Sequence, residues 1–240
     1  MTKQYIQNHK QYFLEKGLTV INSVFSDDEI EKITKCIRNA DTSRENFRKS
    51  DDLFAVRQFL KEISEAKDLI FNDTIKTIVK HLFGEKYFAV KSIYFDKPET
   101  SNWHVAYHQD LTISVDKKVE TEGFGSWTTK KNQFAVQPPL PILENICTIR
   151  IHLDDTDEYN GALKVIPGSH TKGICRPETI DLKTETEKFC DVQKGGVMIM
   201  KPLTLHGSNR TTDGRRRRVI HIEFSDMELP EQLQWSERNN

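Results

Sequence analysis

Several features that would assign this chain to a familiar class are absent. Its 240 residues include only four cysteines, Cys36, Cys147, Cys175 and Cys190, and none of them forms a CxxC pair. A zinc knuckle and a dithiol redox motif are therefore excluded, and we expect reduced thiols in a cytoplasmic protein. The first residues lack the apolar stretch of a signal peptide, and no run is long enough to span a bilayer.

An excess of charge of one sign is also absent. The 35 basic and 36 acidic residues give a formal net charge of −1. Neither a nucleic acid nor a membrane is expected as a partner on this ground. We expect a single domain over residues 1–240, because β-sandwiches and barrels of this length commonly form one domain.

The N-terminal part, about residues 1–85, has helical patterning. Ser26 and Glu29 have the spacing of a capping box, and residues 17–22 resemble a short strand. Apolar residues at helical spacing predict three amphipathic helices: Ile30, Ile33 and Ile37; Leu53, Val56, Phe59, Leu60 and Ile63; and Ile75, Ile78, Val79, Leu82 and Phe83.

From about residue 87 to 225 the apolar period changes to two, which is typical of strands. The predicted strands are 87–95, 106–115, 146–153, 163–166, 196–200 and 217–224. Many short strands with helices gathered at one end predict a mainly β fold with flanking helices, a sandwich or jelly roll. The polar connection 116–141, with Phe124, Trp127 and Phe134, is long enough to be a lid over a functional site.

The segment Tyr107-His108-Gln-Asp110 suggests a metal site. On a strand, residues two apart face the same side, so His108 and Asp110 offer two ligands of the two-histidine, one-carboxylate triad of non-haem iron proteins. The pair His152 and Asp154 has the same form, and His104 lies four residues before His108. Sequence spacing alone does not choose among these candidates.

Arg217, eleven positions after His206, adds a second observation. Alternation along 217–224 separates an apolar face from a face that carries Arg217, Val219 and His221. A guanidinium that faces the inside of a β-barrel needs an anion, and the distal carboxylate of 2-oxoglutarate would fit it in a bidentate manner. The neighbouring Arg215, Arg216 and Arg218 are expected to be solvated surface residues.

Taken in order, these motifs resemble the phytanoyl-CoA dioxygenase family. The resemblance rests on His108-Gln-Asp110, on Asn160-Gly-Ala-Leu-Lys-Val-Ile-Pro-Gly-Ser-His170, on His206-Gly-Ser208 and on Arg217. It extends from about residue 10 to 225. The stretch 136–145, which runs into 148–155, is similar to the uncharacterised bacterial branch of the family.

The resemblance implies a double-stranded β-helix, a cupin-like jelly roll, and assigns roles residue by residue. His108, Asp110 and His206 would bind Fe(II), with no further catalytic residues. Arg217 and Ser208 would hold 2-oxoglutarate, the co-substrate used with O2. Arg150 and Lys91 would reach the same pocket, although a surface position for Lys91 is an equal alternative. By the same matching, His152 and Asp154 are structural or line the pocket, His170 lies in a turn, and His104 lies near the mouth.

The implied reaction is hydroxylation of an unactivated C–H bond of a small molecule, with release of succinate and CO2. Relatives that halogenate have a small residue in place of the carboxylate, and this chain keeps Asp110. Two alternatives stay open: a cupin-like metal protein without oxygenase activity, and a non-catalytic binding domain on the same scaffold. The sequence does not choose among acyl-CoA, amino-acid, lipid and natural-product substrates, and it does not indicate an oligomeric state.

Overall fold

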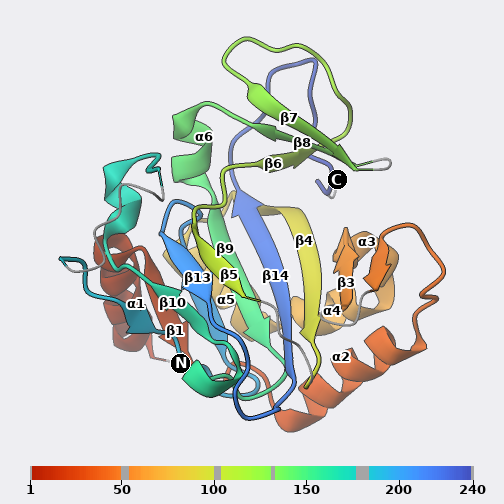
Figure 1. Cartoon of the computed structure of the whole chain (residues 1–240), viewed down its shortest axis with the longest axis vertical. Coiled ribbons are helices and arrows are strands. Elements are labelled where there is room, and N and C mark those ends of the chain that lie inside the picture. The colour runs from red at the N-terminus through yellow and green to blue at the C-terminus, as the bar shows by residue number, and fades with distance from the viewer. Residues whose placement is uncertain (1, 50–53, 100–103, 131–132, 177–183, 239–240) are drawn as a thin grey trace.

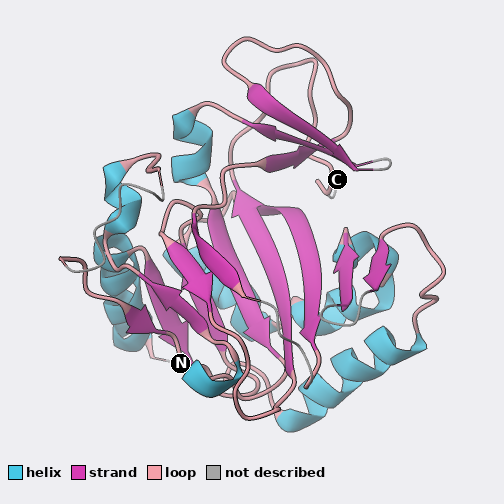
Figure 2. Ribbon diagram, in the orientation of Figure 1, coloured by secondary structure: helices cyan, strands magenta, loops and turns pink. Residues whose placement is uncertain are grey.

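The computed structural model describes residues 2–49, 54–99, 104–130, 133–176 and 184–238. Helices, a large sheet and a smaller sheet lie in successive layers, and a third, small sheet lies above one end of the large sheet (Figures 1 and 2). Within these ranges, no helix combines the length and apolar character needed to cross a membrane.

The helical layer comes mainly from the N-terminal part of the chain. The Ser26 hydroxyl accepts from the Glu29 amide and the Glu29 carboxylate accepts from the Ser26 amide, so the predicted capping box is confirmed. The helices are α1 (Lys3–Lys16), α2 (Asp27–Asn39), α3 (Phe59–Glu62), α4 (Lys67–Ile70), α5 (Asp73–Leu82) and α6 (Leu140–Asn145), with 3-10 turns η1 (Ser64–Ala66), η2 (Glu158–Asn160) and η3 (Ser169–Lys172).

In the described part of the chain, the large sheet has seven strands in the order β1-β12-β9-β14-β4-β3-β2. All its neighbours are antiparallel. The strands are β1 (Leu18–Ile21), β2 (Phe47–Lys49), β3 (Phe54–Arg57), β4 (Phe88–Lys97), β9 (Cys147–His152), β12 (Val197–Met200) and β14 (Arg217–Ser225).

Two smaller sheets complete the fold. One faces the large sheet and has the order β11-β10-β13-β5; the other has the order β6-β8-β7. The first contains β5 (Val105–His108), β10 (Leu163–Val165), β11 (Lys188–Phe189) and β13 (His206–Ser208). The second contains β6 (Ile113–Val115), β7 (Gly125–Lys130) and β8 (Gln133–Gln137). Two β-sheets with flanking helices form the jelly roll that the sequence predicts.

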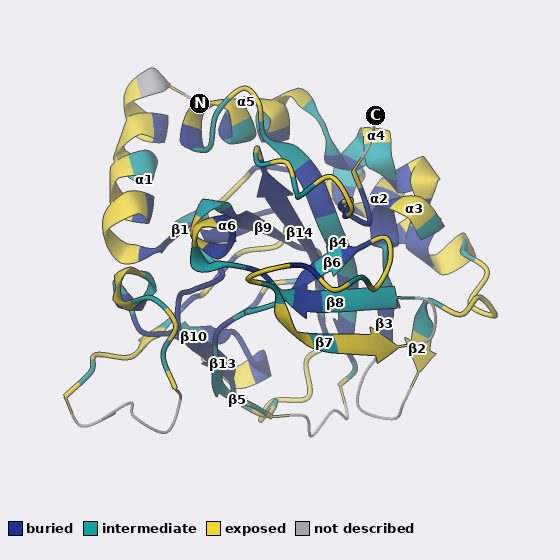
Figure 3. Cartoon of the chain, turned by 90° about the horizontal axis from the view of Figure 1, so that it is seen from above, coloured by how far each residue is buried: buried dark blue, intermediate teal, exposed yellow. Residues whose placement is uncertain are grey.

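Alternation gives the large sheet an apolar face and a polar face. Ile149 and Ile151 of β9 and Ile220 and Ile222 of β14 pack against the helices in the main core. Figure 3 shows these central strands buried between the helices and the four-stranded sheet. The residues between them therefore point toward the four-stranded sheet, where polar side chains are enclosed. This face holds the candidate site.

Three local predictions differ from the structure. The helix expected over 53–63 is wrong for 54–57, which form β3, because Ala55 and Val56 pair with β4. The strand expected over 106–115 is two strands, β5 and β6, which belong to different sheets. The connection 116–141 contains the paired strands β7 and β8, which the sequence patterns did not predict.

Candidate metal centre

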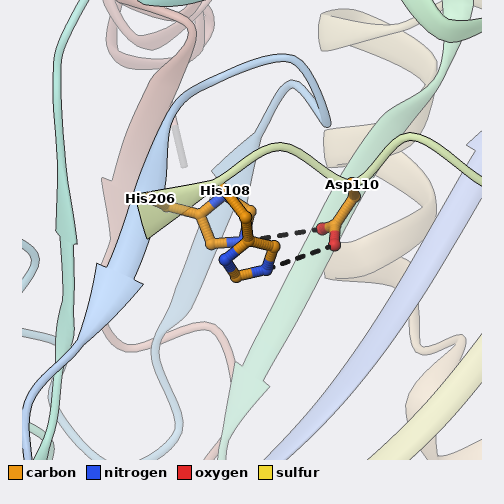
Figure 4. A group of neighbouring side chains, drawn as sticks. All are labelled: His108, Asp110 and His206. Carbon is orange, nitrogen blue, oxygen red and sulfur yellow. Dashed lines mark ion pairs between the residues drawn. The ribbon is translucent and has the colours of Figure 1, made fainter. Parts of the chain in front are cut away.

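Two histidines and one aspartate meet where the four-stranded sheet faces the large sheet. His108 ends β5 and His206 begins β13, and the two are paired across the strands with ring centroids 4.3 Å apart. Asp110 follows β5, and its Oδ1 lies 3.8 Å from His108 Nε2 while its Oδ2 lies 3.7 Å from His206 Nε2 (Figure 4). All three donor atoms lie within 4.8 Å of one another. Of the sequence candidates, these three side chains are brought together.

Backbone carbonyls fix the orientation of both imidazole rings. His108 Nδ1 lies 2.9 Å from the Ala106 carbonyl, and His206 Nδ1 lies 2.8 Å from the Thr204 carbonyl. Because a carbonyl can only accept, each Nδ1 carries the proton and donates it. Each neutral ring therefore presents the lone pair of Nε2 toward Asp110, as a metal ligand requires.

The local electrostatics favour the protonation states of metal ligands. Burial lowers the pKa of His206 to about 4, so the ring is neutral near pH 7. For Asp110, burial opposes ionisation, but the positive charge around it, that of Lys91 included, outweighs burial and holds the pKa well below its usual range. The site therefore combines a neutral imidazole of His206 with the ionised carboxylate of Asp110.

Local contacts explain why the residues around the triad are a glutamine and a glycine. The amide nitrogen of Gln109 donates to the Gly173 and Leu203 carbonyls at 2.9 and 2.7 Å, which ties the turn between His108 and Asp110 to two other segments. A Cβ on Gly207 would lie 2.8 Å from the Val105 carbonyl oxygen. Glycine therefore allows β13 to approach β5 beside the register shift that follows His206.

A cavity of about 190 Å³ opens beside the triad, and Arg217 lies in its wall. Arg217 begins β14 and is only 8% exposed. Its Nε and Nη1 have no hydrogen-bond partner among the described residues. Burial, with a smaller contribution from Arg150, lowers the pKa of Arg217 to about 9, which still leaves the guanidinium charged at pH 7. The cavity therefore presents a buried cation that lacks an anion. Ser208 lies in the same cavity wall.

A chain of polar contacts forms the wall opposite Ser208. Arg150 Nη1 donates to His221 Nδ1 at 3.0 Å, and His221 Nε2 donates to Glu223 Oε1 at 3.1 Å. Lys91 Nζ donates to the same carboxylate oxygen at 2.8 Å. Lys91 is thus inside the cavity wall rather than on the surface, and Glu223 balances its charge. Arg150 keeps an unpartnered Nε within the described residues and faces the cavity with Arg217.

The donor set fits a first-row divalent metal with oxygen or nitrogen preference. Two imidazole nitrogens and one carboxylate converge, and at separations of 3.8 and 3.7 Å the nitrogens form no hydrogen bond with the carboxylate oxygens. Arg217, in the wall of the same cavity and without a hydrogen-bond partner for Nε or Nη1 among the described residues, fits a bound carboxylate. A group with a metal-chelating end and a distal carboxylate would satisfy both features.

The rival residues are engaged elsewhere. Asp154 accepts two bonds from the Arg218 guanidinium, at 2.6 and 2.9 Å, and His152 Nδ1 bonds to Thr156 Oγ1 at 2.9 Å. His104 is exposed, and His170 lies in the turn η3, as expected. The arginines beside Arg217 are not merely solvated, because each one pairs with a carboxylate: Arg215 with Asp157 and Asp213, Arg216 with Asp96, and Arg218 with Asp154.

Sequence reasoning gave no site role to His221, Glu223 or Gln109. The signal for the first two was available, because alternation from Arg217 places His221 and Glu223 on the same face of β14. The role of Gln109 depends on contacts to residues more than sixty positions away, which no local pattern reveals.

Comparison with known sequences defines the class. A sequence model of the phytanoyl-CoA dioxygenase family matches residues 13–219, and the chain belongs to this family. A relative from Stutzerimonas stutzeri, described as a probable alpha-ketoglutarate-dependent hypophosphite dioxygenase, is 24% identical over 89% of this chain and 76% of its own length.

Solved structures share the fold. SnoK, a non-heme alpha ketoglutarate dependent carbocyclase from nogalamycin biosynthesis, is 16% identical with a TM-score of 0.71 over 99% of this chain and 87% of its own. EvdMO1 is 18% identical with a TM-score of 0.65 over 92% of this chain. The present chain spans half of the EvdMO1 length. At these identities the likeness shows the jelly-roll fold.

Proposed function

We propose that this protein is an Fe(II)- and 2-oxoglutarate-dependent dioxygenase that uses O2 and acts on a small molecule. The observation that carries the proposal is the convergence of His108, Asp110 and His206 beside the buried, unpartnered Arg217. Family membership and the relative named for alpha-ketoglutarate dependence support it. We propose that the triad holds the iron and that Arg217, with Ser208, holds the distal carboxylate of 2-oxoglutarate.

Bound iron would supply dioxygen activation coupled to decarboxylation of 2-oxoglutarate to succinate. The chain's residues supply position and a dry, charged environment. The Ala106 and Thr204 carbonyls hold the ring orientations of His108 and His206. Arg150 places a second positive charge in the co-substrate cavity, and His221 fixes its guanidinium. Lys91 is proposed to line this cavity and, since Glu223 neutralises it, to orient rather than to bind 2-oxoglutarate.

An anaerobic titration with Fe(II) and then 2-oxoglutarate tests the proposal. We expect His206→Ala to lose iron binding, because one of three donors is removed. We expect Arg217→Gln to keep iron but to bind 2-oxoglutarate roughly 10- to 100-fold more weakly, since a charge-assisted bond in a buried site is lost. Isothermal titration calorimetry measures both affinities.

Arg216→Gln is the matched control for Arg217→Gln, because Arg216 pairs with Asp96 outside the cavity. Its 2-oxoglutarate affinity should equal that of the parent. Absence of 2-oxoglutarate binding by the iron-loaded parent protein would contradict the proposed function.

Hydroxylation is the proposed outcome of the reaction. Asp110 occupies the third ligand position, and its carboxylate faces both histidine Nε2 atoms. A site that keeps this carboxylate has no ligand position freed for a halide. Product analysis by mass spectrometry would show a gain of one oxygen; a halogenated product would contradict the proposal.

The small sheet of β6, β8 and β7 is proposed to act as a lid. Phe124, Trp127 and Phe134 pack against an apolar cluster that also contains Val136 and Trp235. Most of β7 is exposed, so the sheet is attached through one face. We expect substrate to slow proteolysis within 116–141 of the iron- and 2-oxoglutarate-loaded protein. An unchanged cleavage rate would contradict closure.

Two wider assignments complete the proposal. The helical part, about 1–85, and the core, about 87–225, are proposed to form one domain, which is supported by the addition of β1 at one edge of the large sheet and of β3 and β2 at the other. Cytoplasmic location is proposed, and the four free cysteines agree with a reducing compartment. A small-molecule substrate is proposed as the partner, without nucleic acid or membrane.

A further inference from the structure

A second cavity, here called the outer cavity, adjoins the metal centre. It has a volume of about 300 Å³ and lies between the small sheet and strands β3 and β4. Lys91 and Ile93 line both the outer cavity and the cavity of the metal centre. The two spaces are therefore neighbours on one face of the large sheet, and the outer cavity is large enough for part of a small molecule.

Arg57 is a cation in this wall, and the described part of the chain gives it no anionic partner. It pairs with Ile93 across β3 and β4, and directly opposed residues of antiparallel strands share a face. The Arg57 guanidinium is half-buried and has no ion pair or side-chain hydrogen bond among the described residues. Burial lowers the pKa of Arg57, and the nearby Arg48 adds to the effect. A partly desolvated arginine beside a second arginine favours an anionic ligand.

The other charged groups of the outer cavity leave its positive charge in excess. Lys91 is neutralised by Glu223. Glu237 accepts from the Ser92 amide at 2.6 Å, and burial raises the pKa of Glu237 to about 7, which weakens its negative charge. Lys130 lies in the wall, is exposed, and has no ion-pair partner within the described ranges. The charge offered to a ligand is therefore that of Arg57 and Lys130.

Positive charge continues away from the metal centre. A more open hollow of about 510 Å³ shares Arg57, Lys130 and Gln133 with the outer cavity and adds Arg48 and Lys49. Glu45 is the acidic residue of its wall. Cationic side chains thus line the end of the path that is far from the triad. At the triad end, Ile93 and Phe95 lie in the wall together with Arg150 and Arg217 of the proposed co-substrate site.

We propose that the outer cavity binds the anionic end of the substrate, with Arg57 as its main contact and Lys130 beside it. The part of the substrate that is oxidised then lies at the metal centre. The substrate class is a small organic molecule that carries a terminal carboxylate, phosphate or sulfate. This inference rests on the proposed function, because that function places the oxidised part of the substrate at the metal centre. Anion binding by the outer cavity can be tested independently.

Calorimetric titration of inorganic phosphate, phenyl phosphate and phenol into the anaerobic protein with Fe(II) and saturating 2-oxoglutarate tests the site. We expect both phosphates to bind and phenol to bind at least tenfold more weakly than phenyl phosphate. Arg57→Gln should weaken phosphate binding roughly 10- to 100-fold, because a charge-assisted contact is lost. Arg57→Lys should restore part of it, and Lys130→Gln should give a smaller loss.

Arg38→Gln is the matched control, since Arg38 is an exposed arginine on α2 that pairs with Glu31. Its phosphate affinity should equal that of the parent. Circular dichroism establishes that each variant is folded; if Arg57→Gln is not, Arg57→Lys and Lys130→Gln carry the comparison.

Arg217→Gln separates the outer cavity from the co-substrate site. Phosphate binding that persists in Arg217→Gln and falls in Arg57→Gln supports the proposal. Binding that falls in Arg217→Gln and is unchanged in Arg57→Gln overturns it, as does the absence of phosphate binding at millimolar concentration. Failure of the parent to bind 2-oxoglutarate would instead reject the proposed function, and the phosphate comparison would still report on Arg57.

Discussion

At the residue scale, Arg217 is a buried charge whose loss of hydration is not offset by a partner among the described residues. Its guanidinium lies inside the protein with Nε and Nη1 unpartnered among the described side chains. The next residue, Arg218, has the same chemistry but forms a two-bond ion pair with Asp154. The first arginine is thus arranged for an external anion and the second for an internal one.

This contrast predicts opposite effects of the same substitution. Without 2-oxoglutarate, Arg217→Met should raise the free energy of unfolding by about 1–3 kcal/mol, because it removes an uncompensated buried charge. Arg218→Met should lower it, because Asp154 loses its partner. Urea unfolding of both variants measures the difference. A destabilised Arg217→Met variant would show that the guanidinium has a structural partner.

The sequence could point to candidate ligands because their order along the chain is distinctive, and the structure brings His108, Asp110 and His206 together. Alternation placed Arg217 and His221 on one face of β14, and the structure confirms this. His108 and Asp110 meet for another reason than the one expected: β5 ends at His108, and the Asp110 amide donates to the Pro202 carbonyl at 3.0 Å. A tertiary contact, invisible in local spacing, brings the carboxylate back to the site.

At the element scale, the pairing of β13 with β5 positions both histidines. Gly207 lies between His206 and Ser208, and a side chain there would collide with the β5 backbone. Gly207→Ala should therefore separate the strands, lower the unfolding free energy by about 1–3 kcal/mol and weaken iron binding. Calorimetric iron titration and urea unfolding measure the two effects.

Gly125→Ala is the control for Gly207→Ala, because a Cβ on Gly125 would meet nothing within 4 Å. We expect its iron affinity to equal that of the parent. Equal iron affinity in Gly207→Ala would show that the four-stranded sheet tolerates the displacement.

Element boundaries were harder to predict than element types. The helices α2 and α5 were predicted correctly because each has a side-chain cap and a strong apolar period. In contrast, the apolar spacing of Val56, Phe59 and Ile63 also suits a strand followed by a short helix. Gln58, with φ of +50°, makes the turn between them, and a positive φ at glutamine has no sequence signal.

At the scale of the whole molecule, the C-terminal segment joins the large sheet to the small one. Trp235 forms a bridge with Val115 of β6, and Glu237 accepts from the Ser92 amide of β4. Lys61 Nζ donates to the Ser236 carbonyl. The segment thus contacts both sheets and a helix of the N-terminal part.

Glu237 should make the stability of this junction dependent on pH. Burial raises the pKa of Glu237 from 4.5 to about 7, although Ser92, Lys61 and Lys91 oppose the rise. Both states are protonated below pH 4.5. Between pH 4.5 and 7 the unfolded chain releases this proton first, so the Glu237 contribution to stability falls by up to about 3 kcal/mol as pH rises.

Urea unfolding of the parent and of Glu237→Gln at pH 4.5 and 8 measures this contribution. The difference between the two proteins should shift in favour of Glu237→Gln at the higher pH. A difference that does not change with pH would contradict a raised pKa.

Strand β5 has a single neighbour within the described sheets, because it ends the order β11-β10-β13-β5. The proposed iron would bind His108 on this outer strand, His206 on the adjacent strand and Asp110 beyond the strand end. The ion would then cross-link the edge strand β5 to its neighbour β13. Without bound iron, the edge strand β5 would accept a strand from another chain more readily, and the protein would have a greater tendency to aggregate.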